Sequence, residues 1–237
     1  MDTRLIVSWY DEESLISTEF RRLYSKIRHL NPNKDLKRLL ITSATVNEGK
    51  STTAALLATT ISKYRNTKTI LIDCDLRRPT AHKIFGVERE NGFIDVVLNK
   101  KSLKSALKDT FIPKLKILTS GELSKSPAEI FNLPKLKEVF EEIKWYFDTI
   151  VVDCSPIIPV SDPLILSSEM DGALLVVKAG KTPRELVKRA AELMKDAGIQ
   201  IFGIVINNVK DVLPYYYNYR YDYYQDHSNV EKEKWSY

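Results

Sequence analysis

A short strand, a loop and the start of a helix near residue 45 constrain the fold of this chain more than any other feature. The apolar run "RLLITS" is followed by "ATVNEGKST", which leads into a helix-like segment. In that context the ending G-K-S/T is the signature of a phosphate-binding loop, whose backbone N–H groups and helix N-terminus face phosphates. We predict that Gly49 lets the backbone approach, Lys50 reaches the β- and γ-phosphates and Ser51 offers a hydroxyl to Mg²⁺.

Two positions of this loop depart from its usual pattern. Ala44 stands where a first glycine is common, and Asn47 occupies a place often given to glycine. Asparagine tolerates a left-handed backbone better than most residues, so the phosphate cradle can still form. The predicted nucleotide-binding residues are Val46, Asn47, Glu48, Gly49, Lys50, Ser51, Thr52 and, further along the chain, Asn207.

Asn207 ends the run "IVINN" and allows two interpretations. Its amide can both donate and accept hydrogen bonds, which suits contact with the edge of a nucleotide base. A residue at the end of a strand also commonly belongs to a turn. The sequence favours neither interpretation.

Near-continuous apolar runs alternate with helix-length segments along the rest of the chain. Such runs are typical of strands covered on both faces, and their alternation predicts an α/β fold of the P-loop NTPase type, a mostly parallel sheet flanked by helices. We expect helices at 51–64, 134–146 and 183–197, and an amphipathic helix at 11–30 with basic residues on its outer face. The predicted strands are "KRLLITS", "KTILIDCD", "LKILTS", "FDTIVVDCS", "GALLVVKAG" and "QIFGIVINN".

The helix at 183–197 has the clearest predicted ends. Thr182 and Glu185 have the spacing of a capping box, Pro183 suits the first helical position, and Gly198 suits the C-terminal cap. We therefore predict a hydrogen-bonded cap at its start.

Aspartates stand at the ends of two of the predicted strands. Asp73 and Asp75 follow "ILI", and Asp153 follows "DTIVV". Ligands bind at the carboxyl ends of strands in open α/β sheets, so these carboxylates should face the bound phosphates. With Mg²⁺ present, one carboxylate can hold metal-bound water while another orients a hydroxyl proton. A solvated turn after the strand is the alternative for the pair.

These positions give a candidate catalytic set and a candidate metal set. Arg77 would balance the local charge or pair with a neighbouring subunit. The predicted catalytic residues are Lys50, Asp73, Asp75 and Arg77, and the predicted Mg²⁺ residues are Ser51, Asp75 and Asp153.

The C-terminal segment gathers tyrosines in a way that no core requires. Seven of the 12 tyrosines lie between positions 215 and 224, and the apolar rhythm stops beyond Asn208. We therefore expect an N-terminal helical segment at 1–36, a core at 37–209 and a tail at 210–237. The tyrosines are Tyr215, Tyr216, Tyr217, Tyr219, Tyr221, Tyr223 and Tyr224.

Composition limits the location of the chain. No window approaches the roughly 18 consecutive apolar residues of a membrane span, and the start lacks the layout of a signal peptide, so we expect a cytoplasmic protein. Cys74 and Cys154 have neither metal-binding spacing nor a disulfide framework and are expected to be buried thiols.

The loop "TSATVNEGKST", the strands "LIDCDLRRP" and "IVVDCSP" and the tyrosine-rich tail resemble the bacterial tyrosine kinases that regulate capsular and extracellular polysaccharide export. The resemblance implies a P-loop ATPase-like fold and autophosphorylation of the tail tyrosines with ATP and Mg²⁺. It also implies activation by a transmembrane polysaccharide co-polymerase, a location at the inner face of the plasma membrane, a ring of neighbouring subunits and a cognate tyrosine phosphatase.

The resemblance assigns further roles residue by residue. It makes Asp73 the base that orients the tyrosine hydroxyl and Asp75 a residue of the magnesium sphere. The segment "EFRRLYSK" is similar to a family helix that contacts the next subunit, with Glu19 and Arg22 in place. Ser25 stands where the family has a second arginine, so the chain departs from the family pattern at this position.

Two other classes of protein share some of these features. A partitioning or division-site ATPase has the same fold, but it usually carries an extra lysine at the place of Thr45. A non-catalytic ATP-binding adaptor would use the tyrosines as a docking or nucleic-acid stacking surface. Such a surface normally interleaves basic residues, whereas positions 215–224 hold only Arg220 and the acidic Asp222, so no nucleic acid is expected.

Overall fold

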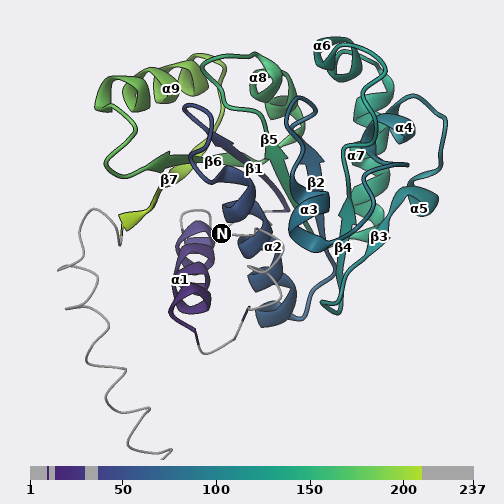
Figure 1. The fold of residues 1–237 in the computed structure, drawn as a ribbon, viewed down its shortest axis with the longest axis horizontal. Helices are drawn as coiled ribbons and strands as arrows, with labels where there is room; N and C mark the ends of the chain where they lie inside the picture. Colours follow the sequence, from purple (N-terminus) through teal and green to yellow (C-terminus); the bar gives the residue numbers. More distant parts are fainter. Residues whose placement is uncertain (1–9, 11–13, 30–36, 210–237) are drawn as a thin grey trace, which may run out of the picture.

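The computed structural model describes residue 10 and residues 14–29 and 37–209, and these form one sheet with helices on both faces (Figure 1). The sheet has seven strands in the order β3-β4-β2-β5-β1-β6-β7. The strands are β1 (Arg38–Ser43), β2 (Thr69–Cys74), β3 (Lys108–Asp109), β4 (Leu115–Leu118), β5 (Thr149–Cys154), β6 (Gly172–Lys178) and β7 (Ile201–Asn207).

All neighbouring strands run parallel except β3, which pairs antiparallel with β4. Each of the six predicted apolar runs forms a strand, which confirms the predicted fold class. The two-residue strand β3 was not predicted, because "KD" has neither length nor apolar character to mark it. The structure thus adds one short antiparallel edge to a parallel sheet.

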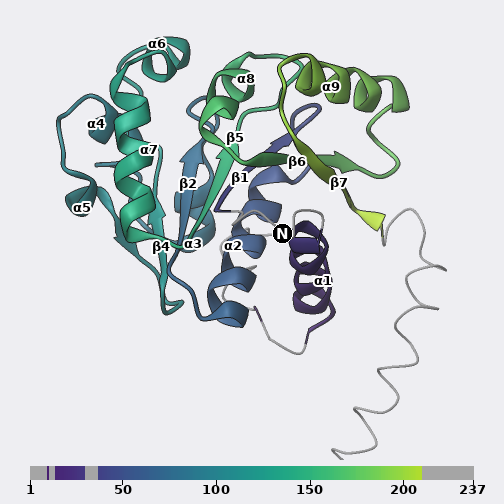
Figure 2. The ribbon, with the colours of Figure 1, turned by 180° about the vertical axis from the view of Figure 1, so that it is seen from behind.

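Two hydrophobic clusters fill the spaces between the sheet and its helices. Figures 1 and 2 show how the helices cover the two faces of the sheet. One cluster lies under α1 (Leu15–His29), α2 (Lys50–Arg65) and α3 (Ala81–Phe85). The other lies under the remaining helices, which are α4 (Phe93–Val97), α5 (Leu103–Ala106), α6 (Pro127–Phe131), α7 (Lys135–Tyr146), α8 (Asp162–Leu166) with the short 3₁₀ turn η2 (Ser167–Glu169), and α9 (Arg184–Asp196).

The predicted helices are present with ends that differ by a few residues, but the predicted capping box of α9 is wrong. Pro183 precedes the helix with an extended ψ of 143°, and no side chain caps its first turn. The Thr182 hydroxyl instead accepts the N–H of Lys178 at 2.9 Å and donates to the carboxylate of Glu48. Thr182 therefore binds the loop before α2 and not the helix that follows it.

The period of two along β2 and β5 decides which side chains face α2. Leu71 and Val151 belong to the cluster under α2, whereas Ile72 and Val152 belong to the opposite cluster. Side chains alternate between the two faces of a strand. Asp73 and Asp153 therefore point towards the α2 side, and Cys74 and Cys154 point into the opposite core.

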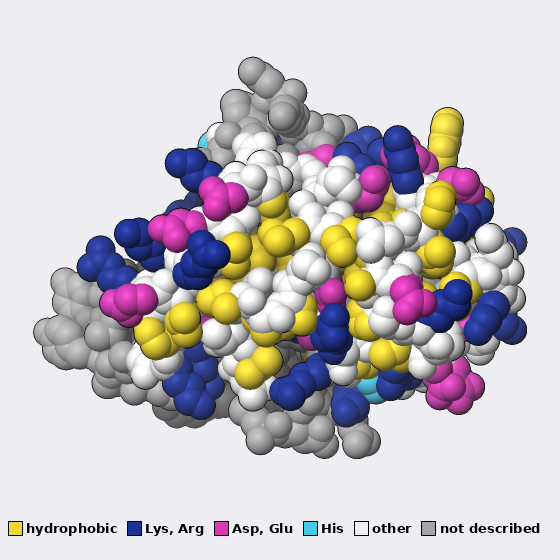
Figure 3. Space-filling view, turned by 90° about the horizontal axis from the view of Figure 1, so that it is seen from above, with side chains coloured by type: hydrophobic (Ala, Val, Ile, Leu, Met, Phe, Trp, Pro, Cys, Tyr) yellow, Lys and Arg dark blue, Asp and Glu magenta, His cyan; other side chains and the backbone are white. Residues whose placement is uncertain are grey.

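The N-terminal helix α1 packs on α2, with Ile27 buried in the shared cluster. The division of the chain at residues 36 and 209 stays a prediction, and the tyrosine tail at 210–237 lies outside the described residues. Among the described helices, none is long and apolar enough to cross a membrane. Figure 3 looks down on the top of Figure 1, where basic and acidic side chains are interspersed around hydrophobic ones.

Candidate functional site

The predicted phosphate-binding loop runs from the carboxyl end of β1 into α2. Asn47 has a φ of 62° and Gly49, which precedes the first turn of α2, has a φ of 91°. Both values are left-handed, so Asn47 adopts the backbone conformation that was predicted for it. The loop turns sharply into the helix, as a phosphate cradle requires.

Glu48 ties this loop to two distant parts of the chain. Its carboxylate, on a residue only 3% exposed, accepts the N–H of Thr45 at 2.8 Å and the hydroxyl of Thr182. Its carbonyl accepts Nδ2 of Asn207 at 3.0 Å. Thr182 lies before α9 and Asn207 ends β7, so the loop is held from behind by the edge of the sheet. No sequence spacing pointed to Thr182, because 134 residues separate it from Glu48.

Gly49 and Asn207 lie closer together than any residue with a side chain at position 49 would permit. A Cβ at position 49 would lie 2.0 Å from Nδ2 of Asn207. Position 49 therefore requires glycine for two reasons, the left-handed φ and the short distance to the Asn207 side chain. The Asn207 amide also accepts the N–H of Asn208 at 2.8 Å, so in this structure it positions the loop; contact with a nucleotide base stays a prediction.

Lys50 begins α2 and lies among three carboxylates. Its Nζ is 2.7 Å from Asp75 and 3.4 Å from Asp153, and it donates to the Ser51 hydroxyl at 3.1 Å. Burial alone would lower the pKa of Lys50, but the charges of Asp153 and Asp75 outweigh it and raise that pKa above its ordinary value. Lys50 thus stays a cation at every physiological pH.

Asp73 is fully buried and is positioned by backbone donors. Its Oδ2 accepts the N–H groups of Thr80 at 3.0 Å and Ala81 at 2.9 Å, and its Oδ1 accepts that of Asp75 at 3.2 Å. Burial and the neighbouring charge of Asp153 nevertheless raise the pKa of Asp73 to about 7. A carboxylate poised near neutral pH has the properties of a general base.

Asp75 has the opposite balance. Burial would raise its pKa, but the charge and hydrogen bond of Lys50 lower it below its ordinary value. Its Oδ1 also accepts the N–H of Arg78 and the hydroxyl of Ser155, each at 3.0 Å. Ser155 was missed from the sequence, although it follows the aspartate of "VVDCS" by only two positions. The negative form of Asp75 is therefore favoured beside Lys50.

Arg77 has a partner within its own chain. Its Nε donates to Asp162 at 3.0 Å and a terminal nitrogen donates at 3.3 Å, while Asp162 is buried in the first turn of α8. Of the two roles predicted for Arg77, balance of local charge fits this contact. The bond joins the loop after β2 to the first turn of α8.

Asp153 and Ser51 fit a magnesium ion that is shared with a ligand. Asp153 is 1% exposed, burial raises its pKa, and its Oδ2 has no hydrogen-bond partner among the described residues. In residues 14–29 and 37–209 no three His, Cys, Asp or Glu side chains form a metal cage. Magnesium at nucleotide sites needs only one or two protein groups, because phosphates and water supply the other ligands. The unpaired oxygen and the Ser51 hydroxyl are such groups.

The structure describes some of the remaining predicted residues, and their predicted roles stay predictions. Val46 is 46% exposed at the tip of the loop, and Thr52 is in the first turn of α2. Glu19 and Arg22 pair with each other at 2.6 Å on the surface of α1. The thiols of Cys74 and Cys154 are free and buried, as predicted, and burial raises the pKa of both. The tail tyrosines lie outside the described residues.

Comparison with known proteins decides the family. A family model described as an AAA domain matches residues 45–181, more than half of the chain. Over 207 residues the chain is 34% identical to the tyrosine-protein kinase YwqD of Bacillus subtilis, covering 87% of each protein. The chain belongs to the bacterial tyrosine-protein kinases. This membership confirms both the resemblance and the enzyme class that the sequence indicated.

Solved structures agree with the predicted P-loop ATPase-like fold. The chimerical protein CapA2B2 superposes with a TM-score of 0.81 at 27% identity, covering 87% of this chain and 89% of the other. The septum site-determining protein MinD of Pyrococcus horikoshii, solved with Mg-ADP, gives a TM-score of 0.61 at 23% identity, covering 72% and 69%. The second likeness shows the shared fold alone, so the division-site alternative receives no functional support from it.

Proposed function

We propose that this kinase transfers the γ-phosphoryl group of ATP to tyrosines of its own C-terminal tail and thereby regulates polysaccharide polymerisation and export. The observation that carries the proposal is the position of Lys50 Nζ, which lies between Asp75 and Asp153 at the mouth of the phosphate-binding loop. The buried Asp73, on the same face of the sheet, supplies a base beside this cation. Family membership supports the choice of tyrosine as the acceptor.

The reaction is an in-line displacement at phosphorus. The bond from the γ-phosphorus to the β,γ-bridging oxygen breaks, a bond to the tyrosine oxygen forms, and ADP leaves. The phenolic proton, with an ordinary pKa of about 10, passes to Asp73. Lys50 exchanges its two carboxylate partners for the phosphates, where it neutralises the charge on the transferred group. Ser51, Asp153 and Asp75 are the residues that would hold Mg²⁺, which would supply further neutralisation of the phosphate charge.

The surrounding contacts keep these groups in place while the nucleotide changes. Glu48 and Asn207 hold the loop from behind, and the bond from Arg77 to Asp162 holds the segment that carries Asp75. These contacts position the catalytic groups. Such positioning matters because a displacement of a catalytic group by about 1 Å can lower the reaction rate 10²-fold.

Delivery of the tail takes place between subunits of a ring, through the helix that carries Glu19 and Arg22. Each phosphotyrosine adds a charge of about −1.5 to −2, so three or four would cancel the net charge of +5 and repel the acidic site of a neighbour. A membrane co-polymerase is the expected activator, in line with the two-part name of the CapA2B2 chimera. A tyrosine phosphatase resets the cycle.

Incubation of the full chain with radiolabelled ATP and Mg²⁺ tests the proposal. Label on tyrosine is expected, and it should be lost when all seven tyrosines at 215–224 are replaced by phenylalanine. Replacement of Tyr64 and Tyr146, which are exposed on the core, is the matched control and should keep the label. Release of phosphate without any labelled tyrosine would contradict kinase activity and favour a switch ATPase. Label on the core alone would contradict the tail as substrate.

A further inference from the structure

The outer strand β7 is an unprotected edge of the sheet. Within the described part of the chain it pairs only with β6. Natural proteins protect such edges with charged residues or proline, and "IFGIVIN" contains neither. Ile204 and Ile206 are 48% and 59% exposed. An uncharged apolar edge of this kind is a template for another strand.

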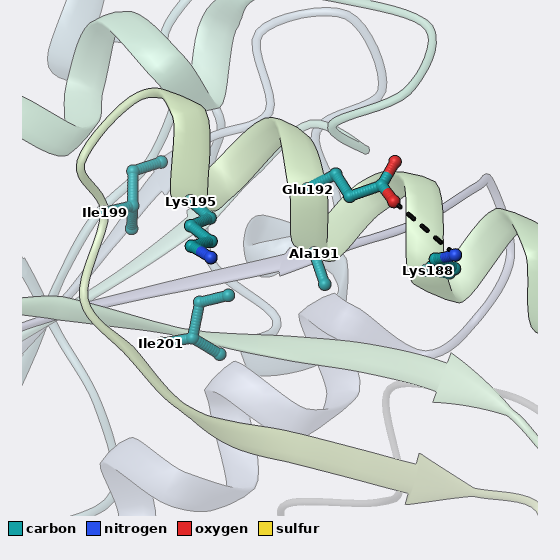
Figure 4. Close-up of a pocket in the computed structure, with 6 residues that line it drawn as sticks. All are labelled: Lys188, Ala191, Glu192, Lys195, Ile199 and Ile201. Carbon is teal, nitrogen blue, oxygen red and sulfur yellow. Dashed lines mark ion pairs between the residues drawn. The ribbon is translucent and has the colours of Figure 1, made fainter.

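The exposed isoleucines lie on the α9 face of the sheet. Val205 packs against the cluster under α1 and α2, and side chains alternate along a strand, so Ile204 and Ile206 point the other way. A shallow groove of about 410 Å³ lies at the start of the same strand, between β7 and α9 (Figure 4). The apolar surface thus extends along β7 from this groove to the two isoleucines.

The walls of this groove combine apolar and basic groups. Its apolar part consists of Ala191, Ile199 and Ile201. Lys188 and Lys195 project from α9, and Figure 4 shows Lys195 extending towards the start of β7 while Lys188 pairs with Glu192. Aromatic rings with polar tips suit such a surface, because the ring covers apolar atoms and the hydroxyl stays near the lysines.

The tail carries a pattern that matches an added strand. Tyrosine occupies every second position from 215 to 223, which puts five phenols on one face of an extended segment. Tyrosine is favoured in strands, and Pro214 stands directly before the segment, where a strand tolerates proline. The tail also begins beside this edge, because only residues 208 and 209 separate its start at 210 from the end of β7.

We propose that residues 215–223 add to the free edge of β7 of the same chain as an antiparallel strand, with their tyrosine face over Ile204, Ile206 and the groove. Tyr215 then lies opposite Ile206 and Tyr217 opposite Ile204, which puts the tyrosine face on the side of the isoleucines. The connection of residues 207–214 is long enough to reverse the chain. Because the two partners belong to one chain, their effective concentration is in the millimolar range, which favours docking without a large interface. The open edge of the sheet is thereby closed by the kinase's own substrate segment.

This docking gives the tail a regulated state, a step that rests on the proposed function. Docked tyrosines are paired along β7 and cannot enter the active site of a neighbouring subunit. A phosphate on the tyrosine face places a charge of about −1.5 to −2 against the isoleucines, which disfavours redocking. Phosphorylation therefore converts a docked tail into a released one.

Amide hydrogen exchange on the full chain without ATP tests the docking itself. We expect slow exchange at residues 215–223 and at the β7 amides that point away from β6. The variant Tyr219→Ser/Tyr221→Ser should speed exchange in both segments at least 10-fold. The matched variant Tyr216→Ser/Tyr224→Ser removes as many phenols from outside the tyrosine face and should change exchange less than 2-fold.

A change on the core side completes the experiment. Ile206→Lys should release the tail like the first pair, whereas Trp145→Lys, at a residue 87% exposed on α7, should leave it docked. Equal exchange in all variants, or protection that depends on protein concentration, would overturn the proposal, the latter by showing that two copies pair edge to edge. Slow amide exchange in this experiment, combined with no tyrosine label in the ATP experiment, would instead contradict the proposed autophosphorylation and still support the docking.

Discussion

The carboxyl ends of β2 and β5 differ sharply from the end of β7, although all three belong to one sheet. The first region holds Asp73, Asp75 and Asp153 almost without exposure and binds Lys50 between two of them. The second exposes Ile204 and Ile206 and carries no charge along its strand. One region is a fixed set of buried charges, and the other is an edge that pairs only with β6 in the described part of the chain. The contact between Asn207 and the loop joins the two.

The largest expected effect is in the charged region. Lys50→Met should lower tail labelling at least 10³-fold, because the cation that neutralises the transferred phosphoryl group is lost. Radiolabel on tyrosine measures it, and Lys104→Met, at an exposed residue of α5, is the control. If Lys50→Met still labels the tail, the charged region is not the catalytic site, because phosphoryl transfer would then not depend on the cation between its carboxylates.

The next effect tests the junction of the two regions. Gly49→Ala should weaken nucleotide binding on the order of 100-fold, since its Cβ meets Asn207 at 2.0 Å and its φ is 91°. Fluorescent-nucleotide titration measures the dissociation constant. Gly86→Ala is a close control, because φ is 67° there but nothing lies within 4 Å of the new Cβ. Equal losses in both variants would mean that backbone strain alone matters and that the two regions are not coupled.

A smaller effect should come from the hydroxyl that holds Glu48. Thr182→Val leaves a buried carboxylate with one donor fewer, a cost of about 1–3 kcal/mol, and should raise KM for ATP 5- to 10-fold with little change in kcat. Thr182→Ser keeps the hydroxyl and should restore the parent KM. If serine fails to restore it, packing of the threonine methyl group, and not the hydrogen bond, positions the loop.

The smallest effect concerns pH. Asp73 has a pKa of about 7 in the folded chain and about 4 when unfolded, so the folded state binds more protons between these values. Its contribution to stability is therefore least unfavourable near pH 4 and worsens as pH rises to about 7. Asp73→Asn should reduce the loss of Tm between pH 5 and pH 8, measured without nucleotide or Mg²⁺, and raise Tm by a few degrees at pH 8. An unchanged pH slope would place the coupled proton on Asp153.

The fold and the positions of the site were readable from the sequence because local rules determine them. A strand, a glycine-lysine loop and a helix specify the phosphate cradle, and parallel strands bring their carboxyl ends to one edge. The contacts from Glu48 to Thr182, Arg77 to Asp162 and Ser155 to Asp75 were not predicted. Each joins residues at least 80 positions apart, so only the three-dimensional fold brings them together. The failed capping box of α9 has the same origin, since a distant carboxylate competes for Thr182.

The matched register of β2 and β5 has a consequence for how this chain must fold. Thr69–Cys74 lies residue for residue against Thr149–Cys154, and the two segments read "TILIDC" and "TIVVDC". Because the two strand sequences are so similar, each could pair in the place of the other. The segments that flank each strand must therefore determine its position in the sheet. A slip of one residue in either strand would turn a cysteine towards α2 and an aspartate into the opposite core. Folding errors in these two strands would therefore destroy core and chemistry together, and no misregistered form of the enzyme could remain partly active.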